Sequence, residues 1–363
     1  MNRPAAPAGA AALLLCALAL PARGAEPEQP LFAFNGFGTL GLVHSSQAAA
    51  DYTFDNLQPA GAGRNHAWSG DVDSRLGGQL TANLNPRLSA VLQLVSEYSP
   101  DNSYRPFVNW ANVQYKFSPA LSVRVGRIAL ASFLASDSRK VGYSNVFARP
   151  PIEVYRLLAL NNSDGVDATY RFQVGDVTNS TTLLYGRRTI TNTRGVDVHS
   201  TGVKGVFDTL DIGALTLHAA YQERSVDNQN PPLGKFMSLG AGYDPGNWFV
   251  SGEWVRVRNY SASGVKAVRA AWYLHGGARF GAFTPYVTLS GLRPLSDTGL
   301  TPVAQRTVAT GVRWDVMRKL DLKLQYDHLR PAGDSYGTLM NVAPDAPKGV
   351  PAHVISLVAD FIF

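Results

Sequence analysis

The sequence predicts an all-β fold, a transmembrane antiparallel β-barrel of about 16 strands. Three observations predict the barrel. Apolar and polar residues alternate along the chain, the alternating segments are often about ten residues long, and short turns alternate with long polar loops. A sheet in lipid has to close on itself, because lipid cannot satisfy the hydrogen-bonding groups of a free strand edge.

The segment that begins at Leu320 shows the alternation most clearly. Leu320, Leu322 and Leu324 occupy one set of alternate positions, while Asp321 and Lys323 occupy the other. Successive side chains of a strand point to opposite faces, so this segment has one apolar wall and one hydrated wall. The same pattern recurs along the chain and predicts a barrel that is apolar outside and polar inside.

The number of alternating segments sets the width of the barrel. An even number brings both chain ends to the same side, so that the first strand can pair with the last. At about 16 strands the interior is too wide for side chains to fill, and an aqueous channel results. The strands are predicted to begin near Phe32, Arg75, Leu88, Phe107, Leu121, Gly165, Val177, Thr201, Leu215, Phe236, Trp248, Val268, Thr284, Arg306, Leu320 and His353.

Residues 1–25 are predicted to be a cleaved signal peptide, and residues 26–363 the barrel. Ala10 to Leu20 forms an apolar core that Pro21 ends, and small residues suitable for cleavage follow. After this segment no apolar run approaches the roughly 20 residues that a transmembrane helix needs, which excludes a helical membrane protein.

Cysteine and charge exclude several further classes. Cys16 is the only cysteine, so the mature chain is expected to contain none and to lack disulfides and cysteine-based metal or redox sites. The formal charge of +6 falls to about +4 once Arg3 and Arg23 leave with the signal peptide. This modest excess favours anionic solutes weakly and does not predict nucleic-acid binding.

Two features of the sequence, a glycine motif and the histidines, do not predict a cofactor or a metal site. Gly36 to Gly41 matches the dinucleotide pattern G-x-G-x-x-G, but strand sequence continues where the motif requires a helix. Its glycines are better explained by a strand that bends or packs closely. The seven histidines are scattered without ligand spacing. We therefore expect neither a cofactor nor a metal.

Two further features accompany the alternating strands: a terminal strand with apolar residues at alternate positions that ends in Phe363, and a long connection at residues 129–164 after the fifth strand. With these features the chain resembles the general Gram-negative porins, the trimeric diffusion channels of the outer membrane. The acidic loop motif of the enteric members is missing, which indicates a divergent branch.

The resemblance implies the location and the function. Small hydrophilic solutes and ions would diffuse passively through an outer-membrane channel that is not an enzyme. The connection at 129–164 would fold into the lumen as the constriction loop. The expected partners are a homotrimer, outer-membrane lipid and lipopolysaccharide, and the barrel-assembly machinery, which would read the strand ending in Phe363.

Charges on the wall and on the constriction loop are the candidate selectivity residues, because a pore selects by its width and its lining charges. The resemblance to the porins implies that arginines on the wall face acidic residues on the constriction loop. Arg75 and Arg124 are the best wall candidates, with Asp137 and Glu153 as opposing acids. Basic residues exceed acidic ones by four to three in the loop, which predicts a mild anion preference. The pore-lining candidates are Arg75, Lys116, Arg124, Asp137, Arg139, Lys140, Arg149, Glu153, Arg156, Arg171 and Arg313.

Other interpretations remain open at this point. Any single wall charge can simply pair with a neighbour or hydrate the lumen. The channel could be specific for one substrate. An outer-membrane barrel enzyme, a phospholipase or protease, is the main rival, and Asp327 beside His328 is the nearest candidate pair. Such enzymes have fewer strands and a blocked lumen, so the strand count discriminates between the two classes.

Overall fold

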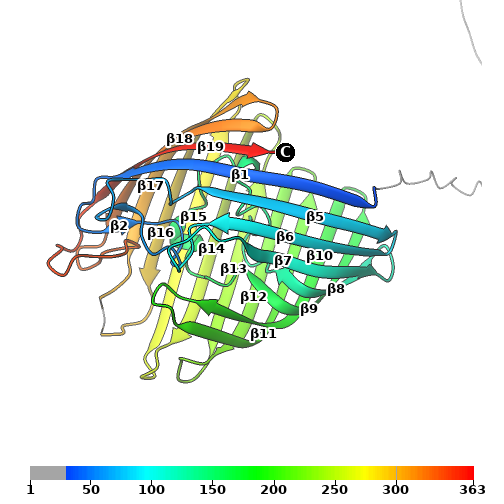
Figure 1. Cartoon of the computed structure of the whole chain (residues 1–363), viewed down its shortest axis with the longest axis horizontal. Helices are drawn as coiled ribbons and strands as arrows, with labels where there is room; N and C mark the ends of the chain where they lie inside the picture. Colours follow the sequence, from blue (N-terminus) through cyan, green and yellow to red (C-terminus); the bar gives the residue numbers. More distant parts are fainter. Residues whose placement is uncertain (1–29, 300) are drawn as a thin grey trace, which may run out of the picture. The chain divides into compact units, whose positions relative to one another are not determined.

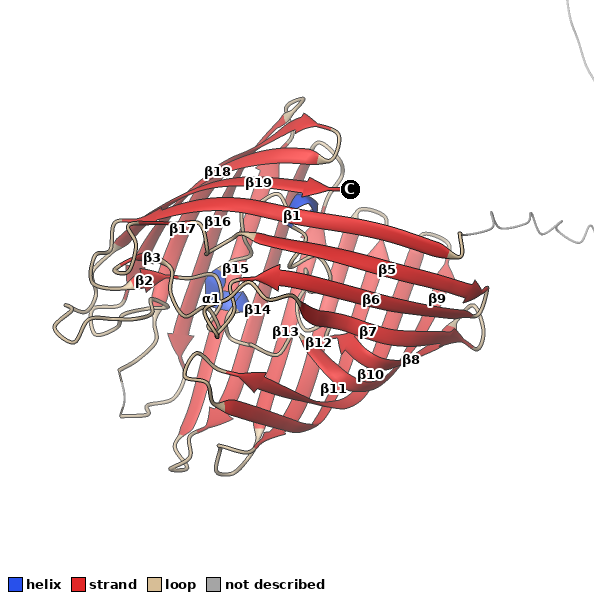
Figure 2. Ribbon diagram, viewed as in Figure 1, coloured by secondary structure: helices blue, strands red, loops and turns tan. Residues whose placement is uncertain are grey.

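A computed structural model describes residues 30–299 and 301–363 as one closed barrel of sixteen long antiparallel strands (Figures 1 and 2). The predicted signal peptide lies outside the described residues. The barrel strands are β1 (Phe32–Ser45), β5 (Arg75–Asn85), β6 (Leu88–Glu97), β7 (Phe107–Lys116), β8 (Leu121–Ala129), β9 (Asn162–Val174), β10 (Val177–Thr191), β11 (Asp197–Ile212), β12 (Leu215–Val226), β13 (Gly234–Tyr243), β14 (Trp248–Tyr260), β15 (Lys266–Ala278), β16 (Phe283–Pro294), β17 (Gln305–Met317), β18 (Leu320–Pro331) and β19 (Ala352–Ile362).

The other elements are short. Three two-residue strands, β2 (Asp51–Tyr52), β3 (Ala62–Gly63) and β4 (Trp68–Ser69), lie in the loop between β1 and β5. A 3-10 helix, η1 (Gly142–Ser144), and a one-turn helix, α1 (Ile152–Tyr155), lie between β8 and β9. No helix among residues 30–299 and 301–363 has the length and hydropathy needed to cross a membrane.

The predicted fold class is confirmed, and the predicted strand starts lie within four residues of the observed ones. β7, β8 and β12 begin at the predicted residues. β11 begins at Asp197 rather than Thr201, because its register with β12 shifts between Thr201 and Lys204. A bulge of this kind places an extra residue in one strand and hides the period of two.

The first and last strands close the barrel. β1 and β19 pair from Phe37 opposite Ile362 onward, and beyond that point Gly36 and Phe363 exchange backbone hydrogen bonds of 2.9 and 3.0 Å. The Phe363 ring occupies the space that a side chain at position 36 would need. The glycine motif therefore serves a strand that packs closely, and the final residue of the chain completes the seam.

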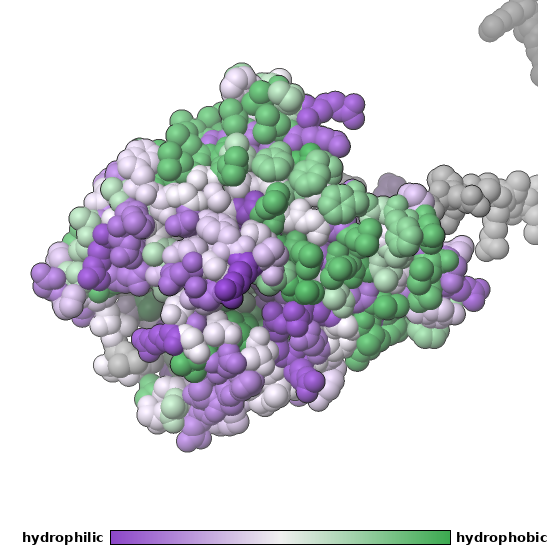
Figure 3. Space-filling model, viewed as in Figure 1, coloured by the Kyte–Doolittle hydropathy of each residue, from purple (hydrophilic) through white to green (hydrophobic). Residues whose placement is uncertain are grey.

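The two faces of the wall differ as the alternation predicts. On β18, Leu322 and Leu324 are exposed on the outward face, whereas Asp321 and Lys323 are buried on the inward face. A broad band of apolar residues covers the outer wall over β5–β9 (Figure 3). Exposed apolar side chains of this kind match a hydrocarbon surrounding rather than water.

A row of glycines crosses the wall at β8, β9 and β10. Gly126 lies opposite Gly165, and Gly165 lies opposite Gly186. At Gly126 the backbone adopts a φ of +127°, and a Cβ atom there would collide with the carbonyl oxygen of Ala111. Glycine is thus required at this position, where the sheet bends sharply.

Replacement of Gly126 by alanine should weaken the barrel. The backbone conformation and the collision with Ala111 both oppose a side chain, so we expect a loss of more than about 1 kcal/mol of folding free energy. The temperature at which the folded band disappears on a semi-native gel measures the change. Gly333→Ala is the matched control, because a Cβ atom there meets nothing within 4 Å. Equal melting of both variants would contradict the proposed role of Gly126.

Candidate functional site

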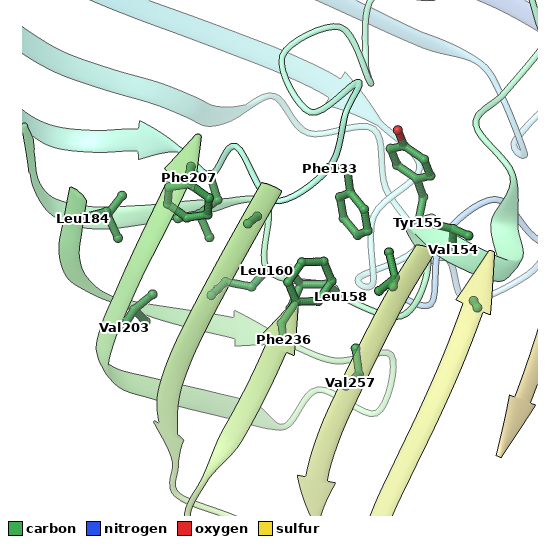
Figure 4. Packing of buried hydrophobic residues seen from close by; sticks show 14 of the residues in the cluster. Phe133, Val154, Tyr155, Leu158, Leu160, Leu184, Val203, Phe207, Phe236 and Val257 are labelled. Carbon is green, nitrogen blue, oxygen red and sulfur yellow. The ribbon is translucent and has the colours of Figure 1, made fainter. Parts of the chain in front are cut away.

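The connection between β8 and β9, residues 130–161, folds inside the barrel and is called the inner loop here. Its apolar side packs against the inward face of the wall (Figure 4). The Phe133 ring stacks on Tyr155 at a centroid distance of 4.5 Å and meets the edge of the Phe236 ring at 5.1 Å. The loop contributes Leu130, Phe133, Val154, Tyr155, Leu158 and Leu160 to this cluster, and the wall contributes Leu184, Val203, Phe207, Phe236, Val255, Val257, Ala271, Tyr273 and Leu292, among others.

Burial of this apolar cluster fixes the inner loop, because apolar surface removed from water contributes about 25 cal/mol per Å². It also explains why part of the inward wall, on β10–β16, is apolar although the strands line a lumen. Sequence alternation does not reveal this, because an inward apolar residue under a loop breaks the apolar-outside pattern. The signal in the sequence is the run of leucines at 157, 158 and 160, which a solvated loop would not contain.

On the side away from the apolar cluster, Arg149 anchors the inner loop to the wall. Its guanidinium donates to Asp73 at 2.8 and 2.6 Å, to Asp327 at 3.3 Å and to the Tyr52 hydroxyl at 3.0 Å. The side chain is 2% exposed. Although Arg149 was predicted to line the pore, the structure buries it between loop and wall. Its partners come from distant parts of the chain, which alternation cannot identify.

Glu153 and Arg156 are likewise buried instead of lining water. Glu153 accepts hydrogen bonds from Ser290 at 2.8 Å and from Gln305 at 2.5 Å. Arg156 donates to Asn56 at 2.8 Å and to the Thr338 carbonyl at 2.7 Å. These two side chains therefore tie the inner loop to the wall and to the loops above it, and Glu153 is not the solvated opposing acid that was predicted.

Two outer loops also fold inward. Residues 46–74, the first outer loop, and residues 332–351, the last outer loop, meet where Asp51 pairs with Met340. Apolar residues of the first outer loop, such as Tyr52 and Val72, pack with α1 residue Ile152 and with β1, β18 and β19. Together with the inner loop, they fill the lumen on the side of these strands.

Wall cations hold the middle of the inner loop. Arg313 donates to the carbonyls of Tyr143 and Asn145 at 2.7 and 3.0 Å and pairs with Asp321 at 3.2 Å. Lys323 donates to the Gly142 carbonyl at 2.8 Å. Arg313 thus lies on the inward wall, as predicted, but its polar groups are engaged by the loop.

An open cavity of about 470 Å³, called the outer cavity here, remains on the outer side of the inner loop, beside β5–β10. Arg139 and Lys140 of the inner loop reach it, and they pair with Asp55, at 3.0 Å, and with Glu97. Arg75 lies beside them, 8% exposed, with its guanidinium 4.9 Å from the centre of the Phe54 ring. The structure therefore brings three of the predicted site residues together at one place.

Arg75 is the least compensated of these cations. Among the described residues, its guanidinium donates to two backbone carbonyls, those of Asp73 at 3.1 Å and Arg139 at 3.5 Å, and to no carboxylate. Glu97 lies opposite Arg75 in register, but its carboxylate pairs with Lys140. Burial lowers the pKa of Lys140, although the neighbouring Glu97 carboxylate opposes that shift. Both cations therefore have incomplete compensation beside an open cavity.

Three arginines of this cavity, Arg105, Arg127 and Arg188, were not among the sequence candidates. Arg127 pairs with Asp164 at 2.6 Å, and Arg188 lies 3.7 Å from the same carboxylate. Arg127 follows the left-handed glycine at 126, and Arg188 follows a register shift after Gly186. Both interruptions move the side chains out of the period of two. The glycines near the strand ends are the one feature of the sequence that could have indicated that Arg127 and Arg188 turn toward the cavity.

The remaining candidates lie elsewhere on the wall and loop. Arg124 and Asp167 form a bidentate pair, with contacts of 2.5 and 3.1 Å. Lys116 and Arg171 are exposed near the short turns, and Asp137 is exposed on the inner loop. None of these residues lines the cavity beside Arg75.

Asp327 and His328, the nearest candidate pair for an outer-membrane enzyme, do not lie together in the structure. The Asp327 carboxylate faces inward toward Arg149, whereas the neighbouring His328 ring lies 4.7 Å from His353 on the outward face. The two side chains point to opposite sides of the wall and do not form a pair. In the part of the chain that the structure describes, no three His, Cys, Asp or Glu side chains are grouped to hold a metal ion.

A closed 16-stranded barrel with a loop folded into its lumen defines a membrane channel. A sequence model of the Gram-negative porins matches residues 9–343. The chain belongs to this family and forms an outer-membrane diffusion channel, as the sequence predicted. Comparison with curated protein sequences gives no match.

Solved structures show the same fold at low sequence identity. An anion-selective porin from Comamonas acidovorans is 16% identical, with a TM-score of 0.63 over 92% of this chain and 99% of that chain. OmpF of Salmonella typhi in complex with daunomycin is 11% identical, with a TM-score of 0.61 over 91% and 97%. The outer-membrane channel DcaP of Acinetobacter baumannii is 10% identical, with a TM-score of 0.61 over 92% and 97%.

Replacement of Arg149 by methionine should loosen the inner loop. The change leaves the buried carboxylates of Asp73 and Asp327 without their cation, which typically costs about 3–5 kcal/mol. We expect a lower melting temperature and a larger, noisier single-channel conductance. Arg318→Met, at an exposed arginine in the short turn between β17 and β18 that forms no ion pair among the described residues, is the control. If Arg149→Met kept the wild-type conductance and stability, Arg149 would not anchor the loop.

The lowered pKa of Lys140 predicts a change in selectivity at alkaline pH. The folded pKa lies below the unfolded one, so raising the pH neutralises Lys140 in the folded channel before ordinary lysines lose their protons. The anion preference should then decrease below pH 10.5, the ordinary lysine pKa. Reversal potentials between pH 7 and that value measure the effect. Lys140→Arg should abolish the change, because arginine stays charged; an identical titration in this variant would exclude Lys140.

Proposed function

We propose that this channel admits small hydrophilic solutes with a mild preference for anions, and that the outer cavity is where the preference arises. The single observation that carries the proposal is the charge of the cavity lining. Six basic side chains line it against three acidic ones, Asp55, Glu97 and Asp101. The basic residues are Arg75, Arg105, Arg127, Arg139, Lys140 and Arg188.

The ion pairs described above do not cancel this excess. Arg127 and Arg188 share one carboxylate, that of Asp164, and Arg75 is bonded only to carbonyls. A narrow water-filled passage with low-dielectric walls strengthens such a field and raises the local concentration of anions. Passage needs no covalent chemistry and no cofactor, and we propose that the chain is not an enzyme.

A substrate-specific channel is the second candidate, and the three inward loops favour it. They reduce the free lumen to a passage beside β5–β10 rather than a wide bore. Phe54, Tyr98 and Phe107 line the same cavity as the cations. A small organic anion with an apolar part would contact both kinds of side chain, whereas a general pore would treat it like chloride.

Assembly and surroundings are part of the proposal. We infer a homotrimer embedded among outer-membrane lipid and lipopolysaccharide, delivered by the barrel-assembly machinery through the strand that ends in Phe363. One similar structure, OmpT of Vibrio cholerae, is described as a trimer form. The final residue of this chain is engaged in the closing seam, which is consistent with a late step of assembly.

Planar bilayers with a salt gradient test the anion preference directly. Stable openings with a reversal potential on the anion side are expected. A cation-side reversal potential would contradict the proposal. Organic anions added to one side distinguish the two candidates, because concentration-dependent block at low concentration favours a substrate-specific site and its absence favours a general pore.

Arg124→Glu should shift the selectivity toward cations. The substitution places a second carboxylate beside Asp167 and removes its guanidinium partner, which changes the wall charge by two units. We expect the reversal potential to move by several millivolts toward the cation value. Arg318→Glu, in the exposed turn between β17 and β18, is the control for a charge change outside the lumen. An unchanged potential would place Arg124 away from the ion path.

A further inference from the structure

A stack of aromatic rings and guanidinium groups connects β5 with β15 through two loops in the lumen. The guanidinium of Arg75, on β5, lies 4.9 Å from the centre of the Phe54 ring in the first outer loop. The guanidinium of Arg139, in the inner loop, lies 5.5 Å from the same ring and 5.8 Å from the Tyr155 ring. Tyr155 in turn reaches Tyr273 of β15, with 6.3 Å between the ring centres. Among the described residues, Phe54 is thus the ring that two cations share.

The Phe54 ring attracts both guanidinium groups. An aromatic face carries partial negative charge, and a cation within about 6 Å of the ring centre is attracted to it, more strongly where water is excluded. Water is largely excluded here, since Phe54, Arg75 and Arg139 are 5%, 8% and 5% exposed. The shared ring therefore offsets part of the repulsion between two like charges that lie close together.

Hydrogen bonds of the first outer loop fix the position of Phe54. Its backbone N–H donates to Gln58 Oε1 at 2.8 Å, and Gln58 Nε2 donates to the carbonyls of Asp71 and Val72, each at 3.0 Å. Gln58 is itself buried. The segment that accepts these hydrogen bonds leads directly into β5, which begins at Arg75. The ring and Arg75 are therefore tied to the same hydrogen-bonded corner of the loop.

A carboxylate lies on the next strand and would take Arg75 if the ring released it. Glu97 of β6 is opposite Arg75 in register, and its carboxylate pairs with Lys140. Side chains of opposite charge at directly opposed positions of a sheet attract each other. An Arg75 that left the Phe54 ring would join the pair of Glu97 and Lys140. The outer cavity would then lose the cation that has no carboxylate partner among the described residues.

We propose that Phe54 is a positioning residue for ion selection. By holding Arg75 and Arg139 against its ring, it keeps their charge at the outer cavity, which all three side chains line, and keeps Arg75 from pairing with Glu97. The inference rests on the proposed anion preference and names the residue that sets its size. An uncharged side chain of the first outer loop thus determines the charge that passing solutes meet.

Fluorinated phenylalanines at position 54 of the full channel test the electrostatic role of the ring. Fluorine withdraws negative charge from the aromatic face with little change in shape, so the attraction for guanidinium groups weakens as fluorines are added. Reversal potentials in a KCl gradient give the anion-over-cation permeability ratio. We expect this ratio to fall to about half the wild-type value with trifluorinated phenylalanine, and by less with monofluorinated phenylalanine. Phe54→Leu should lower it at least as far, because the site stays apolar but loses the aromatic face.

Phe147 provides the matched control, because it is a buried phenylalanine of the inner loop with no lysine or arginine over its ring among residues 30–299 and 301–363. The same fluorinated residues at Phe147 should leave the permeability ratio unchanged, and heat-dependent gel mobility confirms that each variant is folded. An anion-side potential that fluorination of Phe54 does not reduce would overturn this inference alone, as would an equal reduction in the Phe147 series. A cation-side potential of the wild-type channel would instead overturn the proposed function, and this inference with it.

Discussion

Every part of this molecule depends on the requirement that backbone N–H and C=O groups be paired within lipid. A spanning sheet satisfies it only when its first and last strands meet. Here residues 37–45 of β1 pair with residues 354–362 of β19, and the contact continues between Gly36 and Phe363. Glycines at 36 and 38 make room for the rings of Phe363 and Phe361 at this seam. Closure then fixes which face of each strand meets lipid and which faces the lumen (Figures 2 and 3).

A barrel of this width would be an open bore if nothing entered it. The inner loop narrows it by two kinds of contact, an apolar cluster on β10–β16 and buried charges on the opposite side. The charged contacts are costly to desolvate, and they are tolerated because each cation meets carboxylates or carbonyls in good geometry, as Arg149 does with Asp73. The result is a loop held on both sides, with a charged passage left open along one wall.

The excess positive charge of the chain is concentrated in the cavity of the lumen. Cations such as Arg75 line this cavity, where they face water and passing solutes. The modest net charge of the whole chain conceals this arrangement, because many of the acidic residues are engaged in contacts of the inner loop and leave the cavity basic.

Much of the fold was determined by the sequence alone, because lipid on one side and water on the other impose a period of two that survives in nearly every strand. The strand count and the closing of the sheet follow from that period and from the lengths of the connections, whereas the inward loop was expected only from the resemblance to the porins. The candidate site could be predicted from the sequence only in part. Alternation places Arg75 and Arg124 on the inward face, but only the tertiary structure decides that Arg149 and Glu153 are buried, that Arg127 and Arg188 turn toward the cavity, and that three loops share the lumen. The physical reason is that burial and ion pairing join residues distant in the chain, and bulges at glycines break the local period that sequence can report.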